Sequence, residues 1–179
     1  MDRAIFAGGC FWCTEAIFMD IEGVVEVSPG YIGGDMENPT YEMICTGKTG
    51  HVEAIEIIYN SKIVTYLKLL EIFFDTHDPT QVDGQGNDIG SQYLSVIYFT
   101  NNHQKEEAIK YIERIVNNYH SPIITKLYSE KPFYKAEGYH ENYFNNNRGQ
   151  PYCQIVIEPK YKKFINEYND LLKINKTIN

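Results

Sequence analysis

The sequence predicts an α+β fold in which helices pack on a mixed, largely antiparallel sheet. Strand-like and helix-like stretches mix along the chain without the regular strand–helix–strand cadence of a parallel α/β protein. A hydrophobic fraction of 43% and a charged fraction of 22% are ordinary for a soluble globular protein. The 179 residues suit one domain and contain no internal repeat, low-complexity tract or linker, so we expect a single domain over residues 1–179.

Short apolar or alternating runs predict the strands. Residues 3–7 (RAIFA) form an apolar run that stops at two glycines, and residues 51–59 (HVEAIEIIY) alternate as a half-buried strand does. The other predicted extended segments are residues 22–32 (EGVVEVSPGYI), 93–99 (YLSVIYF) and 123–128 (IITKLY).

Helices are predicted from capping residues and from apolar periodicity. One helix is expected after Cys13, and the Asn pair at 101–102 can cap another over residues 103–119. Asn-Pro-Thr at 38–40 is typical of a helix start, which would place Tyr41 in the first turn. Apolar side chains mark the inner faces of three helices: Ile63, Leu67, Leu70 and Phe74; Ala108, Ile112, Ile115 and Tyr119; and Tyr161, Phe164, Tyr168 and Leu171 in a C-terminal helix of about residues 160–173.

Charge and hydropathy exclude two classes of partner. The formal net charge is −8, whereas nucleic-acid binding needs a basic footprint that neutralises phosphates. No run approaches the roughly 18 apolar residues of a membrane span, and the N-terminus does not look like a signal peptide. We therefore expect a cytoplasmic protein without nucleic-acid or membrane partners. In a reducing compartment its four cysteines are expected to be catalytic, metal-binding or buried rather than disulfide-bonded.

The stretch AGGCFWCTEA, residues 7–16, carries the strongest chemical signal. It places Cys10 after a strand and two glycines, at the first turn of a helix, where free N–H groups and the helix dipole favour a thiolate. Cys13 would lie one turn later on the same face, which allows a disulfide between the two. Phe11 and Trp12 between the sulfurs suggest that a small apolar group is held beside the nucleophile.

Other interpretations of this cysteine pair remain open. A structural zinc site needs four ligands, but Cys45 and Cys153 are isolated and no histidine falls near them at finger spacing. The pair could also be two buried, small apolar residues. A thioredoxin-like fold is disfavoured because a strand beginning at residue 3 leaves no room for the strand and helix that usually precede the motif.

Two acids stand in positions suited to chemistry. Glu53 shares one face of its strand with Ile55 and Ile57, and a carboxyl group on an apolar face has a raised pKa and can act as a general acid. The alternative is an edge position where Glu53 reaches water. The stretch GNDIGSQY, residues 86–93, sets Asp88 among glycines and Tyr93 at the start of a strand, as in loops that line clefts and in ordinary turns.

Taken in order, four segments resemble type A peptide methionine sulfoxide reductases. They are GGCFWCTEAIF, GYIGGDMENPTYEMICTGKTGHVEAIEIIYN, FFDTHDPTQVDGQGNDIGSQYLSVIYF and AEGYHENYF, in register from about Ala4 to Lys163. The motifs GCFW, GHVEA and GNDIGSQY are specific as a set. The resemblance implies a two-layer α/β sandwich with a ferredoxin-like core and long coil segments.

The resemblance also implies an activity and its participants. Members of the family reduce the S epimer of methionine sulfoxide, free or in proteins, to methionine, and so repair oxidised proteins. No bound cofactor is implied. The implied reductant and partner is thioredoxin, with dithiothreitol as its substitute in vitro, and we expect the protein to act as a monomer.

Individual roles follow from the same resemblance. Cys10 corresponds to the nucleophile that attacks the sulfoxide sulfur and is left as a sulfenic acid, and Glu53 to the acid that protonates the sulfoxide oxygen. A second thiol then condenses with Cys10, and thioredoxin reduces the disulfide. The implied substrate-binding residues are Phe11 and Trp12 around the S-methyl group, Tyr41 and Tyr93 on the oxygen, and Asp88.

Two departures from the family pattern leave the resolving thiol open. Cys13 stands where glycine is usual, and the Gly-rich tail with two cysteines is missing. Cys153 lies where one-cysteine members place theirs, after a flank (NNNRGQPY) expected to be mobile, and it is the favoured resolving thiol. Cys13 is the alternative, although joining it to Cys10 would strain the turn.

Three further residues have less certain places. Cys45 is expected to be buried and structural, and His140 and Glu141 are expected near the cleft mouth or in packing. Two other functions are kept as alternatives. One is a general thiol–disulfide oxidoreductase using Cys10 and Cys13, and the other is a zinc- or partner-binding module.

Overall fold

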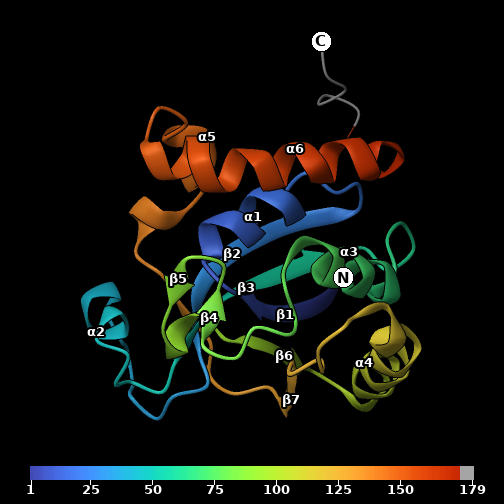
Figure 1. Ribbon diagram of the computed structural model, residues 1–179, viewed down its shortest axis with the longest axis horizontal. Coiled ribbons are helices and arrows are strands. Elements are labelled where there is room, and N and C mark those ends of the chain that lie inside the picture. Colours follow the sequence, from blue (N-terminus) through green and yellow to red (C-terminus); the bar gives the residue numbers. More distant parts are fainter. Residues whose placement is uncertain (174–179) are drawn as a thin grey trace.

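The computed structural model describes residues 1–173 and confirms the predicted α+β class (Figure 1). Residues 174–179 of the predicted domain lie outside the described residues. The strands are β1 (Asp2–Gly8), β2 (Val24–Ile32), β3 (Val52–Tyr59), β4 (Gly84–Gln85), β5 (Asp88–Ile89), β6 (Ser95–Phe99), β7 (Lys126–Ser129) and β8 (Tyr134–Lys135). The helices are α1 (Phe11–Phe18), α2 (Tyr41–Cys45), α3 (Tyr66–Thr76), α4 (Asn102–Ile115), α5 (Tyr143–Asn146) and α6 (Glu158–Glu167).

The main sheet has the strand order β7-β6-β1-β3-β2-β8, while β4 and β5 form a separate hairpin. Strand β1 runs antiparallel to both β3 and β6, β3 runs antiparallel to β2, and β7 lies parallel to β6. With α1 and α3, the four central strands follow the order strand–helix–strand–strand–helix–strand. This arrangement is ferredoxin-like, so the predicted mixed, largely antiparallel sheet is confirmed.

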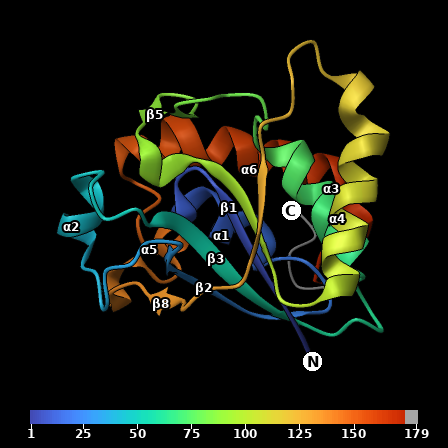
Figure 2. The ribbon, with the colours of Figure 1, turned by 90° about the horizontal axis from the view of Figure 1, so that it is seen from below.

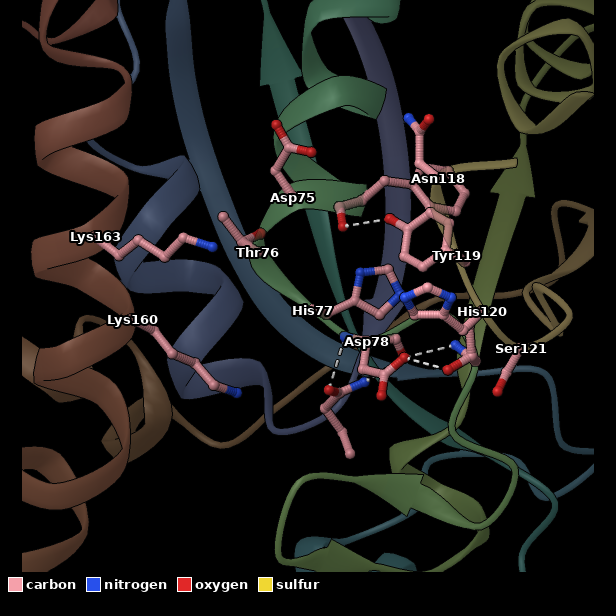
Figure 3. A pocket seen from close by; sticks show the side chains of 13 residues that line it. Asp75, Thr76, His77, Asp78, Asn118, Tyr119, His120, Ser121, Lys160 and Lys163 are labelled. Carbon is pink, nitrogen blue, oxygen red and sulfur yellow. Dashed lines mark hydrogen bonds between the residues drawn. The ribbon is translucent and has the colours of Figure 1, made fainter. Parts of the chain in front are cut away.

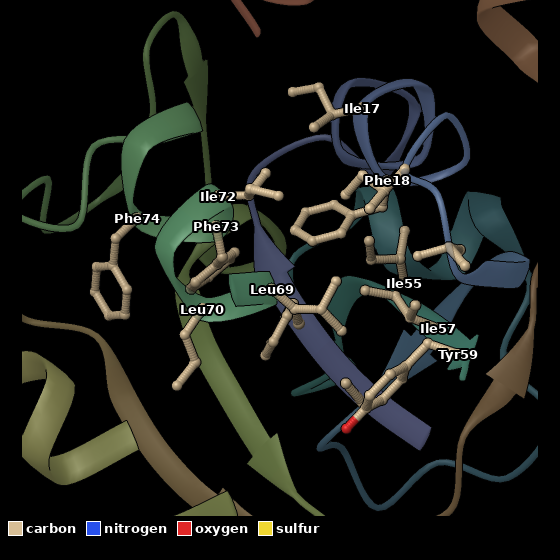
Figure 4. Packing of buried hydrophobic residues seen from close by; sticks show 14 of the residues in the cluster. Ile17, Phe18, Ile55, Ile57, Tyr59, Leu69, Leu70, Ile72, Phe73 and Phe74 are labelled. Atoms are coloured by element: carbon tan, nitrogen blue, oxygen red, sulfur yellow. The ribbon is translucent and has the colours of Figure 1, made fainter. Parts of the chain in front are cut away.

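The sheet is buried on both faces, which explains why residues 4–8 of β1 are all apolar rather than alternating. On one face, α1 and α3 cover the strands: Phe18 of α1 lies close to Ile55 in Figure 4, and Phe73 of α3 stacks on Phe6 at 4.9 Å. Helix α6 forms an outer layer over α1 (Figure 1). On the opposite face, coil residues Leu94 and Phe133 pack against a second cluster: Ile5, Ala7, Ile32, Val52, Ala54, Val96 and Tyr98.

Side-chain caps determine where several helices begin. Thr40 caps α2, because its hydroxyl accepts a hydrogen bond from Met43 N, and Asn101 caps α4 in the same way. Both starts are as predicted. Helix α3 begins only after its own cap, Thr65, so Ile63 lies outside the helix and is 57% exposed. The predicted stripe of this helix was therefore wrong at its first position.

Two boundaries in the second half of the chain also differ from the prediction. The strand predicted at 123–128 is β7, Lys126–Ser129, because its register is set by parallel pairing with β6. The helix predicted at about 160–173 begins earlier and ends earlier: helical backbone starts at Pro151, and α6 ends at Glu167. Between them lies a π-helical turn, Cys153–Ile157, in which Glu158 N donates to Cys153 O.

The π-helical turn explains why sequence reasoning placed the helix start too late. Proline lacks an N–H, and in a regular α-helix its ring clashes with the carbonyl four residues earlier. For Pro159 that residue is Ile155, which lies inside the wider turn. In the sequence, Pro159 is typical of a helix start, although helical backbone already begins at Pro151. Among residues 1–173, no helix is long and apolar enough to cross a membrane.

Candidate active site

The site is built where β1 ends and α1 begins. Gly9 has φ +89°, and a Cβ at this position would meet the Gln85 side chain at 2.6 Å, so the close turn requires glycine. The turn places Cys10 at the N-cap of α1, where its own side chain makes no capping hydrogen bond. A carboxyl from β3 serves instead, because Phe11 N donates to Glu53 Oε2 at 3.0 Å. Two predicted residues, 43 positions apart, are thereby brought together.

Glu53 is buried, with 1% of its surface exposed, opposite Tyr31 in the β2–β3 register. The alternative of a water-facing edge position is therefore wrong. Burial raises the pKa of this carboxyl to about 8, and the hydrogen bond from Phe11 N opposes that shift only in part. At neutral pH the group holds a proton that it can donate.

Three cysteines, Cys10, Cys13 and Cys153, lie in one buried cluster and carry free thiols. Burial raises the pKa of Cys10, while a hydrogen bond from the Cys10 thiol lowers the pKa of Cys13. The predicted preference for a thiolate at Cys10 is thus outweighed by desolvation in the substrate-free site. Burial and then the neighbouring Cys13 raise the pKa of Cys153. Cys13 is the sulfur that neighbours both of the others.

Cys153 is fully buried and is the first residue of the π-helical turn, directly after the flank NNNRGQPY. The turn packs its inward side chains, Cys153 and Ile157, against Ala16 of α1. Tyr152, directly before Cys153, donates from its hydroxyl to Asp88 Oδ2 at 2.6 Å and also hydrogen-bonds with the thiols of Cys10 and Cys13.

Aromatic rings form a wall around Trp12. Its indole stacks on Tyr143 at 3.7 Å with the ring planes 6° apart, and the Tyr152 ring meets it edge-on at 5.7 Å. The indole N–H donates to His140 Nδ1 at 3.0 Å. His140 is completely buried, and burial lowers its pKa, so it is a neutral acceptor. Phe11 is buried beside Trp12, with its ring 6.4 Å from the indole and 5.0 Å from the His140 ring.

The predicted hydroxyl groups lie beside the buried acid. Burial, followed by the charge of Glu53, raises the pKa of both Tyr41 and Tyr93, so both phenols keep their protons and can donate hydrogen bonds. The Tyr41 backbone N–H donates to Glu137 Oε1 at 2.7 Å, which anchors the first turn of α2. The structure thus gathers the predicted nucleophile, acid, aromatic pair, tyrosines and Asp88 around one site.

Sequence reasoning missed Tyr143, Tyr152 and Glu137, and it left His140 between two roles. Each of these residues acts on a partner more than 60 positions away, so no local pattern reveals it. The one available signal was the unusual number of tyrosines, 15 in the whole chain. Glu141, also left open, is exposed.

The prediction that Cys45 is buried was wrong. Helix α2 has five residues and buries only Ile44, so the next residue turns outward by about 100° and is exposed. The Cys45 thiol hydrogen-bonds to the Tyr41 hydroxyl at the rim of the site. Within residues 1–173, no group of three or more His, Cys, Asp or Glu side chains is placed to hold a metal ion.

A separate cavity lies between the end of α3, the coil after α4 and helix α6. It has a volume of about 730 Å³, and Lys160 and Lys163 project into it from α6 (Figure 3). On the opposite wall, both ring nitrogens of His77 already have hydrogen-bond partners, Phe73 O and Ser95 Oγ. Burial lowers the pKa of His77 to about 4. None of the predicted site residues lines this cavity.

Figure 2 shows the end of the molecule where these elements meet. In this view, helices α2 and α5, the edge strand β8 and the hairpin strand β5 all lie toward the left end of the molecule. The site residues therefore come from short, separate segments that converge at one end of a rigid sheet. Such an arrangement is typical of binding and catalytic sites carried by loops on a scaffold.

Comparison with known proteins finds relatives of this chain over nearly its whole length. The profile of the family described as "Peptide methionine sulfoxide reductase" matches residues 2–172. The chain is 47% identical to peptide methionine sulfoxide reductase MsrA of Sulfolobus acidocaldarius over 177 residues, which cover 97% of this chain and 99% of that protein. It also resembles the reduced form of Mxr1 from Saccharomyces cerevisiae, with a TM-score of 0.80, 31% identity and coverage of 85% of this chain and 88% of Mxr1. Mxr1 in complex with Trx2 matches the fold with a TM-score of 0.57 at 22% identity, over 79% of this chain and 84% of that one.

Proposed function

Because the chain belongs to the peptide methionine sulfoxide reductase family, and is an oxidoreductase of that kind, we propose that it reduces the S epimer of methionine sulfoxide, free or within proteins, to methionine. The observation that carries the proposal is a buried, protonated carboxyl held at the start of the helix that Cys10 caps. The backbone N–H of Phe11, the residue after Cys10, donates to Glu53 Oε2 at 3.0 Å. A nucleophile and a proton donor are thus held at one point.

The proposed chemistry uses these two groups in one step. The Cys10 sulfur attacks the sulfoxide sulfur while Glu53 gives its proton to the sulfoxide oxygen, and the S–O bond breaks. The oxygen then bonds to the Cys10 sulfur as the transient bond between the two sulfurs breaks, so methionine leaves reduced by two electrons while Cys10 is oxidised by two, to a sulfenic acid. The neighbouring Cys13 is near enough to take the proton that Cys10 must lose.

The remaining groups bind the substrate in this proposal. The phenols of Tyr41 and Tyr93, protonated and next to Glu53, donate hydrogen bonds to the sulfoxide oxygen. The apolar faces of Phe11 and Trp12 receive the S-methyl group, in line with the favourable contact between sulfur-linked groups and rings. Asp88, held by the Tyr152 hydroxyl, presents a polar group to the rest of the substrate.

For the resolving thiol, the geometry supports Cys13 rather than Cys153. Cys13 hydrogen-bonds with Cys10, whereas Cys153 is buried beside Cys13. The Cys13 thiol condenses with the sulfenic acid, so that a Cys10–Cys13 disulfide forms and water leaves. A dithiol reductant then returns both sulfurs to the thiol state by exchange.

The proposed physiological reductant is thioredoxin, with dithiothreitol as its substitute in vitro. The relative Mxr1 has been solved in complex with Trx2, which supports this choice. We place the protein in the cytoplasm, where thiols are kept reduced, with residues 1–179 acting as one reductase domain.

A single-turnover experiment tests the proposal. Fully reduced protein is mixed with excess methionine (S)-sulfoxide and no reductant, the methionine formed per chain is counted, and the disulfide is mapped by non-reducing peptide mass spectrometry. We expect about one methionine per chain, a Cys10–Cys13 link, and no methionine with Cys10→Ser. If the wild-type chain forms no methionine, the proposed activity is wrong.

Three single variants identify the resolving thiol. With Cys13→Ser, the Cys10 sulfenic acid should persist and be trapped by dimedone, while Cys153→Ser should still form the Cys10–Cys13 link. Cys45→Ser is the matched control, because that thiol is exposed and outside the cluster. A sulfenic acid that accumulates in Cys153→Ser instead would assign the resolving role to Cys153.

A further inference from the structure

A second buried acid, Glu15, has no part in the chemistry described above. It lies in α1 with 3% of its surface exposed, and burial raises its pKa to about 7. Such a carboxyl is costly to desolvate, so its hydrogen-bond partners indicate what it holds in place. Those partners are distant in sequence: Asn142 N donates to Glu15 Oε1 at 2.7 Å, and Tyr143 N donates to Oε2 at 3.3 Å.

The two N–H groups belong to the start of α5, a segment with little stability of its own. Helix α5 has four residues, Tyr143–Asn146, far below the length at which an isolated helix persists in water. Asn142, at its N-cap, adopts φ +51°, and its side chain gives no capping hydrogen bond. The carboxyl of Glu15 therefore does from α1 what a capping residue does in a longer helix.

The first residue of α5 is the one that stacks on the tryptophan. Tyr143 lies 3.7 Å from Trp12 in nearly parallel orientation. Trp12 and Glu15 are three residues apart on α1, so their side chains leave neighbouring positions of one helix face. Trp12 stacks on the Tyr143 ring, and Glu15 accepts a hydrogen bond from the Tyr143 backbone N–H.

We infer that Glu15 is a positioning residue for substrate binding, because it fixes Tyr143 against Trp12 and so orients the indole that receives the S-methyl group. This inference rests on the proposed function for its catalytic consequence. Its structural part, that Glu15 sets the packing of Trp12, can be tested separately. Trp12 also contacts His140, the edge of Tyr152 and the tilted ring of Phe11 at 6.4 Å, but only the Tyr143 ring lies parallel to the indole.

The test compares Glu15→Gln with a matched control, Asp20→Asn. Glutamine keeps one acceptor for Asn142 N but turns an amide N–H₂ toward Tyr143 N. Asp20 is also buried, two residues past the end of α1, and its Oδ2 accepts from Tyr161 OH at 2.5 Å; the Tyr161 ring packs on Phe144 at 5.2 Å. Both variants lose a buried carboxylate from the same region, so general destabilisation affects both.

Two readouts separate positioning from stability. Trp12 is the only tryptophan in the chain, so intrinsic fluorescence reports on this wall alone. Glu15→Gln should red-shift the emission and increase acrylamide quenching, while Asp20→Asn should leave both unchanged. In steady-state assays with dithiothreitol, Glu15→Gln should raise KM for methionine sulfoxide about tenfold and change kcat less than about twofold, as expected when an apolar contact to the substrate is lost.

A double-mutant cycle tests whether the effect passes through Tyr143. In a Tyr143→Leu background, adding Glu15→Gln should change KM by less than about twofold, because the ring that Glu15 positions is absent. If Glu15→Gln is insoluble, Glu15→Met replaces it in the same cycle. Methionine has a similar length and brings no buried amide that would need a hydrogen-bond partner.

Several outcomes would overturn the inference. They are unchanged quenching in Glu15→Gln, the same spectral change in Asp20→Asn, or a full KM effect in the Tyr143→Leu background. Altered fluorescence without any change in KM would show that the wall is positioned but plays no part in binding. If the wild-type chain forms no methionine, the proposed function is wrong. The fluorescence comparison would still test whether Glu15 sets the packing of Trp12.

Discussion

Replacing Glu53 with glutamine should slow the first chemical step and remove one pH dependence. The structure buries this carboxyl beside Cys10 and raises its pKa from 4.5 to about 8. With that pKa, about 90% of molecules are protonated at pH 7 and about 10% at pH 9; an unshifted carboxyl would be protonated in about 0.3% at pH 7. Glutamine has nearly the same shape and can still accept from Phe11 N, but it has no proton to transfer.

The expected loss is about 10²- to 10⁴-fold in the single-turnover rate at pH 7, the range for removing a general acid. The sign of the pH effect follows from the raised pKa: the active, protonated form is lost as pH rises through about 8. The wild-type rate divided by the Glu53→Gln rate should therefore be flat below pH 7 and fall about tenfold per unit above pH 8. Taking the ratio removes the ionisation of Cys10, which the two proteins share while Glu53 is neutral.

The assay is quenched-flow measurement of methionine formed by reduced protein, without reductant, between pH 5.5 and 9.5. Glu56→Gln is the control, since Glu56 lies on the same strand and pairs with Arg3, away from the site. A ratio that stays constant from pH 6 to 9.5 would refute the assignment of Glu53 as the proton donor. A Glu53→Gln variant as fast as the wild type would refute it as well.

Three further changes test the fold around the site. His140→Leu leaves the Trp12 indole N–H without its acceptor and should lower stability to urea by about 1–3 kcal/mol, with part of the loss restored in His140→Gln. Gly9→Ala should lower stability by at least about 1–2 kcal/mol, because Gly9 has φ +89° and an added methyl would meet Gln85, whereas Gly149→Ala has open space and should have little effect on the melting temperature. Phe6→Ala, at a fully buried position, should cost about 3–5 kcal/mol in urea denaturation, against less than about 0.5 kcal/mol for the exposed Val25→Ala.

Local chemistry explains the parts of the site that the sequence predicts correctly. Two features depend only on neighbours within a few residues. They are the turn that leads from β1 through two glycines to Cys10, and the face of β3 on which Glu53 lies. The same holds for the capping of α2 by Thr40. Each follows from backbone geometry or strand alternation, which the chain carries at short range.

Long-range packing determines the rest. The contacts of Tyr143 and Tyr152 join segments 64 to 140 residues apart, and no period in the sequence records them. Helix α2 is too short to show a periodic face, so the exposure of Cys45 could not be read from it. The sequence predicts that Cys10 lies at a helix start, where the helix dipole favours a thiolate. It does not reveal how deeply Cys10 is buried, and burial is the main cause of its raised pKa.

The π-helical turn at Cys153–Ile157 makes the direction of a cysteine depend on a residue count. A π turn is an α-helical turn with one residue inserted, so deleting an exposed residue such as Gln154 could leave the helix continuous. Everything before the deletion would then swing by about 100° around the helix axis, carrying Cys153 away from α1. A single-codon deletion could thus disconnect this thiol from the other two while every cysteine remained in the gene.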